Sequence, residues 1–203
     1  PEQLNYAQWR ARGADAVVIG AVTKTRDGRY DIRFRVMDAV KQTQIAGFVY
    51  FATESQLRLT AHKIADVIYE KLTGDTGVFA TRITYVVKRG PRYELHVADA
   101  DGFGAQSVLS SNEPIISPAW SPDGTQILFG RATADTDNNG FTNTVDNGDL
   151  YVLDLATGSE TQRTNTVEYD DFNFSWSPDG NWIVFTSVRG DVNDDGVQNL
   201  SDS

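Results

Sequence analysis

Two twelve-residue segments of this 203-residue chain carry side-chain oxygens at the spacing of a calcium-binding loop. In residues 135–146 and again in residues 191–202, oxygen-bearing side chains stand at loop positions 1, 3, 5, 9 and 12, with glycine at position 6. The first set is Asp135, Asp137, Asn139, Asn143 and Asp146, joined by the backbone carbonyl of Phe141 at position 7. The second set is Asp191, Asn193, Asp195, Asn199 and Asp202, joined by the carbonyl of Val197.

This spacing suits calcium for a geometric reason. Calcium takes about 6–8 oxygen ligands at roughly 2.3–2.6 Å, and alternate side chains of a tightly coiled loop converge on one point. Each segment places three carboxylates at ligand positions, and these repel one another unless a cation lies between them. Position 12 is Asp, where an EF-hand has a bidentate Glu, so we expect an affinity of roughly 0.1–1 mM. The sequence therefore predicts two structural calcium sites, and the alternative is two solvated Asn/Asp-rich loops.

The acidic residues are concentrated in the part of the chain that holds these segments. The formal net charge is −10. Positions 132–203 hold 14 Asp and Glu but only 2 Lys and Arg, whereas positions 1–131 hold 14 Asp and Glu and 16 Lys and Arg. Nucleic acids and anionic lipids require a basic face, so the balance argues against both as main partners.

Cysteine and long apolar stretches are both missing from the sequence. Without cysteine the chain has neither disulfides nor thiolate metal sites, which fits a cytosolic or a bacterial periplasmic protein. No stretch approaches the ~20 apolar residues that a membrane-spanning helix needs, so we predict no membrane insertion. Pro1 does not begin a signal peptide, so we expect either that one was removed or that the chain starts within a longer protein.

The calcium segments lie within an internal repeat. The motif Trp-Ser-Pro-Asp-Gly occurs at positions 120–124 and again at 176–180, the same interval that separates the two calcium segments, and an apolar strand follows each copy. Positions 93–102 and 149–158 are a second related pair, each with an aspartate near its end and a closing glycine. Four short strands per repeat are typical of a propeller blade, and a blade of ~40–45 residues leaves about a dozen residues for an insertion. The tryptophan of each motif is expected to pack between adjacent sheets.

The first eighty residues have a different pattern. Residues 3–12 are typical of a short helix, and residues 15–22 form a nearly continuous apolar run, which predicts a strand covered on both faces. Residues 30–37 and 44–51 predict two further strands. A long helix follows, with capping-box spacing between Thr53 and Gln56 and a glycine stop at Gly74. We interpret this part as a helix packed on a sheet.

Five motifs then resemble the TolB family of the Tol–Pal system, in family order, over residues 1 to about 124. They are residues 9–20 (WRARGADAVVIG), 66–74 (DVIYEKLTG), 77–83 (GVFATRI), 93–102 (YELHVADADG) and 118–124 (PAWSPDG). The last motif alone is shared by many propellers, whereas the five together are specific. Beyond residue 125 the chain follows only the generic repeat, with insertions that the family does not lead us to expect.

The resemblance implies both a fold and a location. The fold is an α+β amino-terminal domain, a helix on a mixed sheet over residues 1–78, followed by all-β propeller blades over residues 79–203. These residues supply about two blades, a partial β-propeller of the TolB kind with calcium insertions at 135–146 and 191–202. The location implied is the periplasm of the bacterial envelope.

The partners are also implied by the resemblance. Family members bind the lipoprotein Pal through the propeller and the inner-membrane protein TolA through the extreme amino terminus. We expect the stretch that would carry the TolA contact, and most of the blades that would form the Pal surface, to lie outside these residues. A Pal-like lipoprotein is therefore the expected partner by resemblance alone, and no partner-contacting residue is carried over. Propellers close with ~4–8 blades, so open sheet edges also predict possible self-assembly.

The sequence predicts a protein-interaction scaffold and no enzyme. We find no nucleophile elbow, phosphate loop or zinc pattern. His62 is interpreted as a surface residue of the helix, and His96 as a packed structural residue of a blade strand. The acidic run Glu168, Asp170 and Asp171 is interpreted as a solvated loop and not as a pair of catalytic carboxylates. Two alternatives stay open: the propeller domain of a prolyl-oligopeptidase-like peptidase, and a secreted calcium-binding module of the dockerin kind.

Overall fold

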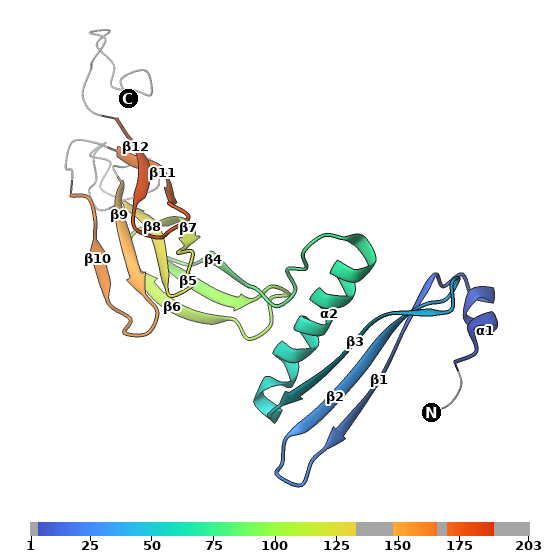
Figure 1. Cartoon of the computed structure of the whole chain (residues 1–203). Helices are drawn as coiled ribbons and strands as arrows, with labels where there is room; N and C mark the ends of the chain where they lie inside the picture. The colour runs from blue at the N-terminus through green and yellow to red at the C-terminus, as the bar shows by residue number, and fades with distance from the viewer. Residues whose placement is uncertain (1–3, 133–147, 166–169, 189–203) are drawn as a thin grey trace. The chain divides into compact units, whose positions relative to one another are not determined.

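A computed structural model describes residues 4–132, 148–165 and 170–188. The chain divides into two compact units, Pro1–Thr81 and Arg82–Ser203, and each unit is described by itself (Figure 1). In the first unit a helix packs on a sheet, and in the second three small sheets follow one another. The predicted fold class, an α+β unit followed by part of a β-propeller, is confirmed.

The sheet of the first unit is antiparallel, which corrects the expectation of a mixed sheet. It contains β1 (Ala16–Lys24), β2 (Tyr30–Asp38) and β3 (Thr43–Ala52) in the order β1-β2-β3. The connections between successive strands are short, and a short hairpin can join only antiparallel neighbours. In the first hairpin Thr25 donates its N–H to the carbonyl of Arg29 at 2.8 Å, and Gly28 takes the positive φ that the turn requires.

The apolar run in β1 is not covered on both faces. Val18 is 44% exposed and Val22 is 63% exposed, although both are paired with residues of β2 that face the helix. The buried cluster of this unit joins the helix to β2 and β3, so β1 is the edge strand that the helix does not cover. A continuous apolar run identified the strand but not the number of its covered faces.

The first unit also contains two α-helices. Helix α1 (Tyr6–Ala11) begins at Asn5, whose side chain accepts a hydrogen bond from the N–H of Gln8 at 3.1 Å. Helix α2 (Leu57–Thr73) follows the short 3-10 helix η1 (Glu54–Gln56). The N–H of Thr53 donates to the side chain of Gln56 at 3.0 Å, as the capping-box spacing predicts, and Gly74 ends α2 in the left-handed conformation.

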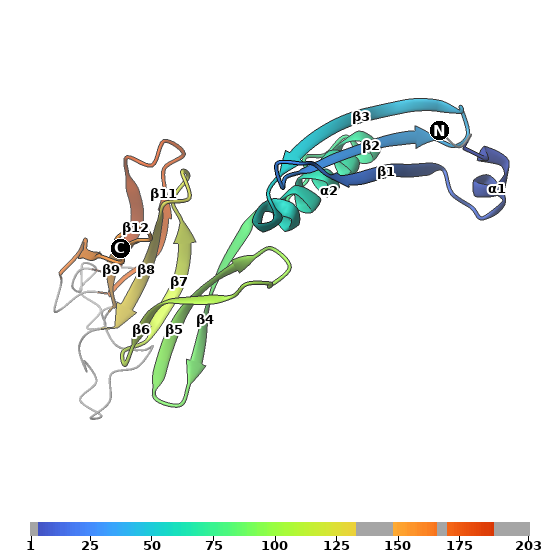
Figure 2. The same cartoon turned by 90° about the horizontal axis from the view of Figure 1, so that it is seen from below.

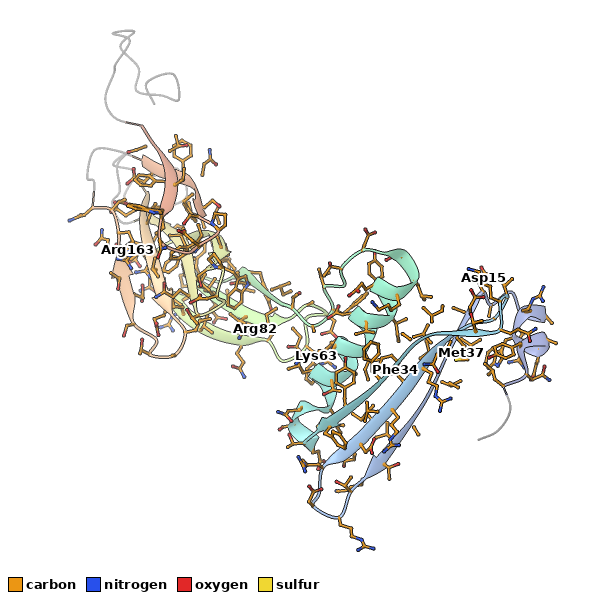
Figure 3. The ribbon with its side chains drawn as sticks, in the orientation of Figure 1. Asp15, Phe34, Met37, Lys63, Arg82 and Arg163 are labelled. Carbon is orange, nitrogen blue, oxygen red and sulfur yellow. The ribbon has the colours of Figure 1, made fainter. Side chains whose placement is uncertain are left out.

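The core of the first unit lies between α2 and one face of the sheet (Figure 2). Phe34, labelled in Figure 3, is 5% exposed and stacks on Phe48 and Tyr50 at ring-centroid distances of 5.8 and 6.2 Å. Ile64, Val67 and Ile68 of α2 pack against this cluster. The helical spacing of these residues therefore produces a single apolar stripe, and burying that stripe is what holds the helix on the sheet.

The segment after α2 is fixed to the helix by one carboxylate. Asp66 accepts hydrogen bonds from the backbone N–H groups of Phe79, at 2.6 Å, and Ala80, at 3.0 Å. Gly77 passes so close that a Cβ there would lie 2.4 Å from the Asp66 Cα, so only glycine fits. The motifs at 66–74 and 77–83 are thus one interlocked feature.

The second unit is all-β. Its first sheet has the order β4-β5-β6 and its second the order β10-β9-β8-β7, while β11 pairs with β12. The strands are β4 (Arg82–Arg89), β5 (Arg92–Asp99), β6 (Gln106–Ser111), β7 (Ile115–Trp120), β8 (Gln126–Ala132), β9 (Gly148–Asp154), β10 (Glu160–Gln162), β11 (Asp170–Trp176) and β12 (Ile183–Val188). All pairings are antiparallel among the described residues.

Two apolar clusters join the successive sheets of this unit. Phe129 and Leu153 of the second sheet pack against Leu95 of the first, and Trp120 lies at the margin of this cluster. Leu128, Leu150 and Val152, on the opposite face of the second sheet, pack against β11 and β12, where Trp176 contributes. The prediction that each tryptophan packs between adjacent sheets is confirmed.

Candidate functional site

The predicted calcium segments fall outside the described residues, but their points of attachment are described. All twelve predicted ligand residues lie within residues 133–147 and 189–203. Strand β8 ends at Ala132 and β9 begins at Gly148, and these two residues are paired. The first segment is therefore an excursion between neighbouring strands of one hairpin. The second segment follows Val188, the last residue of β12, which holds in its repeat the position that Ala132 holds in the earlier one.

A buried carboxylate lies at the base of the first segment. Asp149 is 4% exposed and accepts hydrogen bonds from Gln162 Nε2 and Thr164 Oγ1, both at 3.1 Å. Thr164 Oγ1 also accepts a hydrogen bond from the N–H of Leu150 at 3.0 Å. Satisfying a buried carboxylate with two donors offsets the cost of its burial, and it fixes the start of β9 to the segment after β10.

Arg131 stands directly across from Asp149 in the β8–β9 register. Its guanidinium lies over the rings of Phe129 and Tyr151, 5.3 and 4.7 Å from their centroids, and forms an ion pair with Glu160. Burial raises the pKa of the Tyr151 hydroxyl, and the nearby Arg131 partly opposes that rise. These contacts join the residues at the base of the first segment into one cluster of cation–ring contacts, hydrogen bonds and an ion pair. The described side chains there already have protein partners, so the oxygens for a cation would come from the segment itself.

The Ser-Pro-Asp-Gly turns are built identically in both repeats. Ser121 Oγ donates to Asp123 Oδ1 at 2.6 Å and accepts from the N–H of Gln126 at 2.9 Å. Ser177 Oγ likewise donates to Asp179 Oδ1 and accepts from the N–H of Trp182 at 3.0 Å. The hydrogen bond from the serine hydroxyl is the main cause that lowers the pKa of each aspartate. Both carboxylates are therefore structural parts of a turn.

His96 is a packed residue of the first sheet. It is 8% exposed, its ring stacks on Tyr85 at 5.4 Å, and its Nε2 lies 2.9 Å from Glu94 Oε2. The hydrogen bond with His96 lowers the pKa of the Glu94 carboxyl. This arrangement matches the interpretation of His96 as a structural residue.

The sequence analysis missed the structural roles of two charged residues, Asp171 and Arg131. Asp171 was interpreted as part of a solvated loop, but it lies in β11 and is fully buried. Its place in the later repeat is that of Ile115 in the earlier one, and Ile115 is 3% exposed, so alignment of the repeats could have identified it as an inward-facing position. Arg131 carried no motif, and only its place at the end of an apolar strand would have marked it.

Comparison with known proteins gives the chain clear relatives. Residues 1–45 match the family model described as the TolB amino-terminal domain, and residues 69–137 match the model described as the TolB beta propeller domain. The Tol-Pal system protein TolB of Nitrosomonas europaea is 54% identical over 129 residues, which is 64% of this chain and 30% of the relative. TolB of Aromatoleum aromaticum is 61% identical over 120 residues, covering 59% of this chain and 28% of the relative.

A solved structure agrees with these similarities. The crystal structure of TolB from Acinetobacter baumannii matches 93% of this chain and 56% of its own length, with a TM-score of 0.62 and 28% identity. The chain spans about 30% of the length of the curated relatives it matches. Among the described residues, no helix is both long and apolar enough to cross a membrane.

Proposed function

Over about its first two thirds this chain is a relative of the Tol-Pal system protein TolB, and on that premise we propose that it is a non-catalytic, periplasmic protein-binding scaffold with two calcium-binding loops. The observation that carries the calcium part is the equivalent attachment of both segments. The first leaves the end of β8 and the second the end of β12, at the same point of successive repeats, and each has the complete ligand spacing.

The attachment also favours propeller insertions over a dockerin-like module. A dockerin calcium loop leads into a helix, whereas the first segment leads into β9, which is paired along its length with β8. The second segment begins at position 191 as the first begins at 135, and this is the interval between the Trp-Ser-Pro-Asp-Gly motifs, so both segments have the same place in their repeats. We therefore propose that both loops bind calcium in the manner of ordered hairpin insertions.

Calcium would act here through electrostatics. Positions 132–203 carry 14 acidic and 2 basic side chains, and three carboxylates converge in each proposed site. Binding two divalent cations would remove much of this self-repulsion, so calcium should order the loops and raise the stability of the second unit. With a dissociation constant of about 1 mM and about 10 mM calcium, mass action gives roughly 1.4 kcal/mol of stabilisation per site.

The test is a calcium titration by calorimetry on the chelator-stripped chain. We expect two sites, with Asp135→Ala removing one and Asp191→Ala removing the other, and a melting temperature that rises with calcium. Asp75→Ala, in the other unit, is the matched control and should leave both sites intact. If calcium at several millimolar produced neither heat nor a change in melting temperature, both segments would be solvated turns.

The partner proposal follows the relatives. Because these relatives are named as proteins of the Tol-Pal system, we propose a Pal-like lipoprotein of the envelope as the partner of the propeller part. A soluble Pal domain immobilised on a sensor should bind the chain, and binding should be tested with and without calcium. Absence of binding under both conditions would remove Pal as the partner while leaving the calcium sites untouched.

A further inference from the structure

Helix α2 covers only one face of the sheet in the first unit (Figure 2). Side chains alternate between the two faces along a strand, and Phe34 and Val36 of β2 are buried in the cluster that contacts the helix. Asp31, Arg33 and Arg35 of the same strand therefore point to the opposite face, which we call the outer face. Because β2 is the middle strand, these three residues form a charged column along the centre of the outer face.

Exposed apolar side chains flank this column. On β1, Ile19 is paired with Arg35, and on β3, Val49 is paired with Arg33. Phe51, two residues further along β3, lies on the same face and is 62% exposed. Residues paired across neighbouring strands share a face, so the two arginines stand among exposed apolar side chains.

The two arginines differ in their partners. Arg33 is held by Asp31, to which it donates from Nε to Oδ1 at 2.9 Å and from Nη2 to Oδ2 at 2.7 Å. Arg35 has no carboxylate partner among the residues that the structure describes. Its paired residue on β3 is Gly47, which has no side chain to cover it. Arg35 therefore presents a free guanidinium, whose planar fork of donors matches a carboxylate.

The charges indicate that the outer face is not a permanently buried surface. The face that α2 covers is built from apolar residues, Phe34, Val36 and Ala46. The outer face instead carries an ion pair and a free guanidinium at its centre, and permanent burial of these charges would be costly unless each found a partner. A reversible protein interface combines charged and apolar groups in this way, so that the surface is stable in water when no partner is bound.

The composition of the outer face favours a protein over a lipid surface. Both cations of the column are arginines, and Phe51 adds an exposed aromatic ring. Protein interfaces are enriched in arginine and aromatic residues and depleted in lysine, whereas an anionic membrane attracts lysine and arginine alike. The column holds two arginines against one aspartate, so a partner with acidic side chains complements it.

A second copy of this chain complements the outer face less well. Two copies stacked through this face would bring four arginines against two aspartates, and an excess of positive charge would remain between the sheets. The charge therefore favours a different, acidic protein.

The width of the outer face indicates the shape of the partner. Three strands about 4.8 Å apart span roughly 10 Å, which is close to the diameter of an α-helix, and α2 already packs on the other face of the same strands. We propose that the outer face binds an acidic amphipathic helix of a partner protein, whose carboxylate pairs with Arg35 and whose apolar side chains contact Val49 and Phe51. This surface lies in the first unit, so it requires neither the proposed calcium loops nor the proposed partner of the propeller part.

The test uses the whole chain, a chelator and a fluorescently labelled peptide of about 20 residues, long enough to be helical on its own. One stripe of the peptide alternates leucine and glutamate at helical spacing, and its other positions are alanine and glutamine. We expect this peptide to bind in fluorescence anisotropy, the version with glutamine in place of glutamate to bind more weakly, and the version with lysine not to bind. Chemical-shift changes in NMR should be concentrated at the amides of Arg35, Val49 and Phe51.

Charge reversal then locates the site. Arg35→Glu should weaken binding of the glutamate peptide by roughly tenfold, and Arg35→Gln by less, since glutamine adds no repulsion. Phe51→Ser, which removes the exposed ring, should weaken binding by roughly fivefold or more. The matched control is Lys63→Glu, which makes the same change in charge at an exposed position of α2 and should leave the affinity unchanged (Figure 3). All these side chains are exposed, so the variants should keep the melting temperature of the parent chain.

Three results would overturn the proposal. One is equal binding of the glutamate, glutamine and lysine peptides, or no binding of the glutamate peptide. A second is sedimentation of the chain with vesicles that contain phosphatidylglycerol, lost in Arg35→Glu, since the occupant would then be a lipid surface. A third is a dimer in sedimentation equilibrium that Phe51→Ser abolishes, since the occupant would then be a second copy.

Discussion

The repeat that contains β7 and β8 and the repeat that contains β11 and β12 share their local geometry but differ in burial. Each has a register shift in its first strand, with a residue of positive φ there: Ser117 in β7 and Asn173 in β11. Each also has the same serine-aspartate turn. Yet Leu128 is fully buried, while Val184, its counterpart in the later repeat, is 68% exposed.

The difference separates two kinds of property. Backbone geometry is determined within each repeat, whereas burial depends on the sheet that packs against it. Bulges and turns depend on residues close in sequence, so both repeats form them alike. Leu128 is buried because Phe174, Trp176 and the strand β12 cover it. Among the described residues, Val184 has no following sheet to cover its face, although β12 begins with an apolar triplet, residues 183–185, that corresponds to residues 127–129 of β8.

The largest expected change in the free energy of unfolding comes from truncating Leu128, and the equivalent truncation of Val184 should have little effect. Leu128→Ala would leave a cavity between two sheets and should lower the free energy of unfolding by about 2–5 kcal/mol. Val184→Ala removes an exposed side chain and should change it by less than about 0.5 kcal/mol. Urea unfolding followed by tryptophan fluorescence would measure both. Similar losses for the two variants would mean that Val184 is also packed, and the contrast between the repeats would disappear.

A smaller effect should come from the residues of positive φ. Serine tolerates the left-handed region less well than asparagine, whose side chain hydrogen-bonds locally. Ser117→Asn should therefore stabilise the chain by roughly 0.5 kcal/mol and Asn173→Ser should destabilise it by about as much. Ser175→Asn, an exposed position in the same strand as Asn173, is the control and should show no gain. Changes of the same sign at 117 and 173 would contradict a shared backbone geometry.

The sequence predicted the local elements because local interactions determine them. The cap at Thr53, the stop at Gly74 and both Ser-Pro-Asp-Gly turns rest on contacts within a few residues, and all are present in the structure. The family likewise followed from the combination of motifs, which the relatives confirm.

Properties that depend on distant neighbours could not be predicted in the same way. The apolar run of β1 did not reveal that α2 leaves Val18 and Val22 uncovered, because coverage is decided by where the helix lands. Asp171 was wrongly assigned to a solvated loop for a related reason. Only alignment of the two repeats indicates that this polar residue occupies an inward-facing position of a strand. The calcium loops stay a prediction from spacing, since they lie outside the described residues.

The smallest expected effect concerns the turn carboxylates, and it should be equal in the two repeats. The pKa values of Asp123 and Asp179 are both lowered from an ordinary value of 3.8, first of all by the hydrogen bond from the preceding serine hydroxyl. A lowered pKa in the folded state means that the ionised form stabilises the fold. This stabilisation is complete above the unfolded-state pKa and is lost as the pH falls through the lowered folded-state value.

Asp123→Asn and Asp179→Asn should therefore each flatten the fall in unfolding free energy below about pH 4, and by similar amounts. The measurement is urea unfolding at a series of pH values between about 2 and 6, with Asp75→Asn as a control from the other unit. Equal changes would show that the turn carboxylate contributes the same free energy of unfolding whether or not another sheet covers its repeat. The contributions of Leu128 and Val184, by contrast, are expected to differ. A larger change at Asp123 would instead show that packing of the adjoining sheets strengthens the hydrogen bonds of the turn. The stability of the turn would then depend on neighbouring sheets, as the burial of Leu128 does.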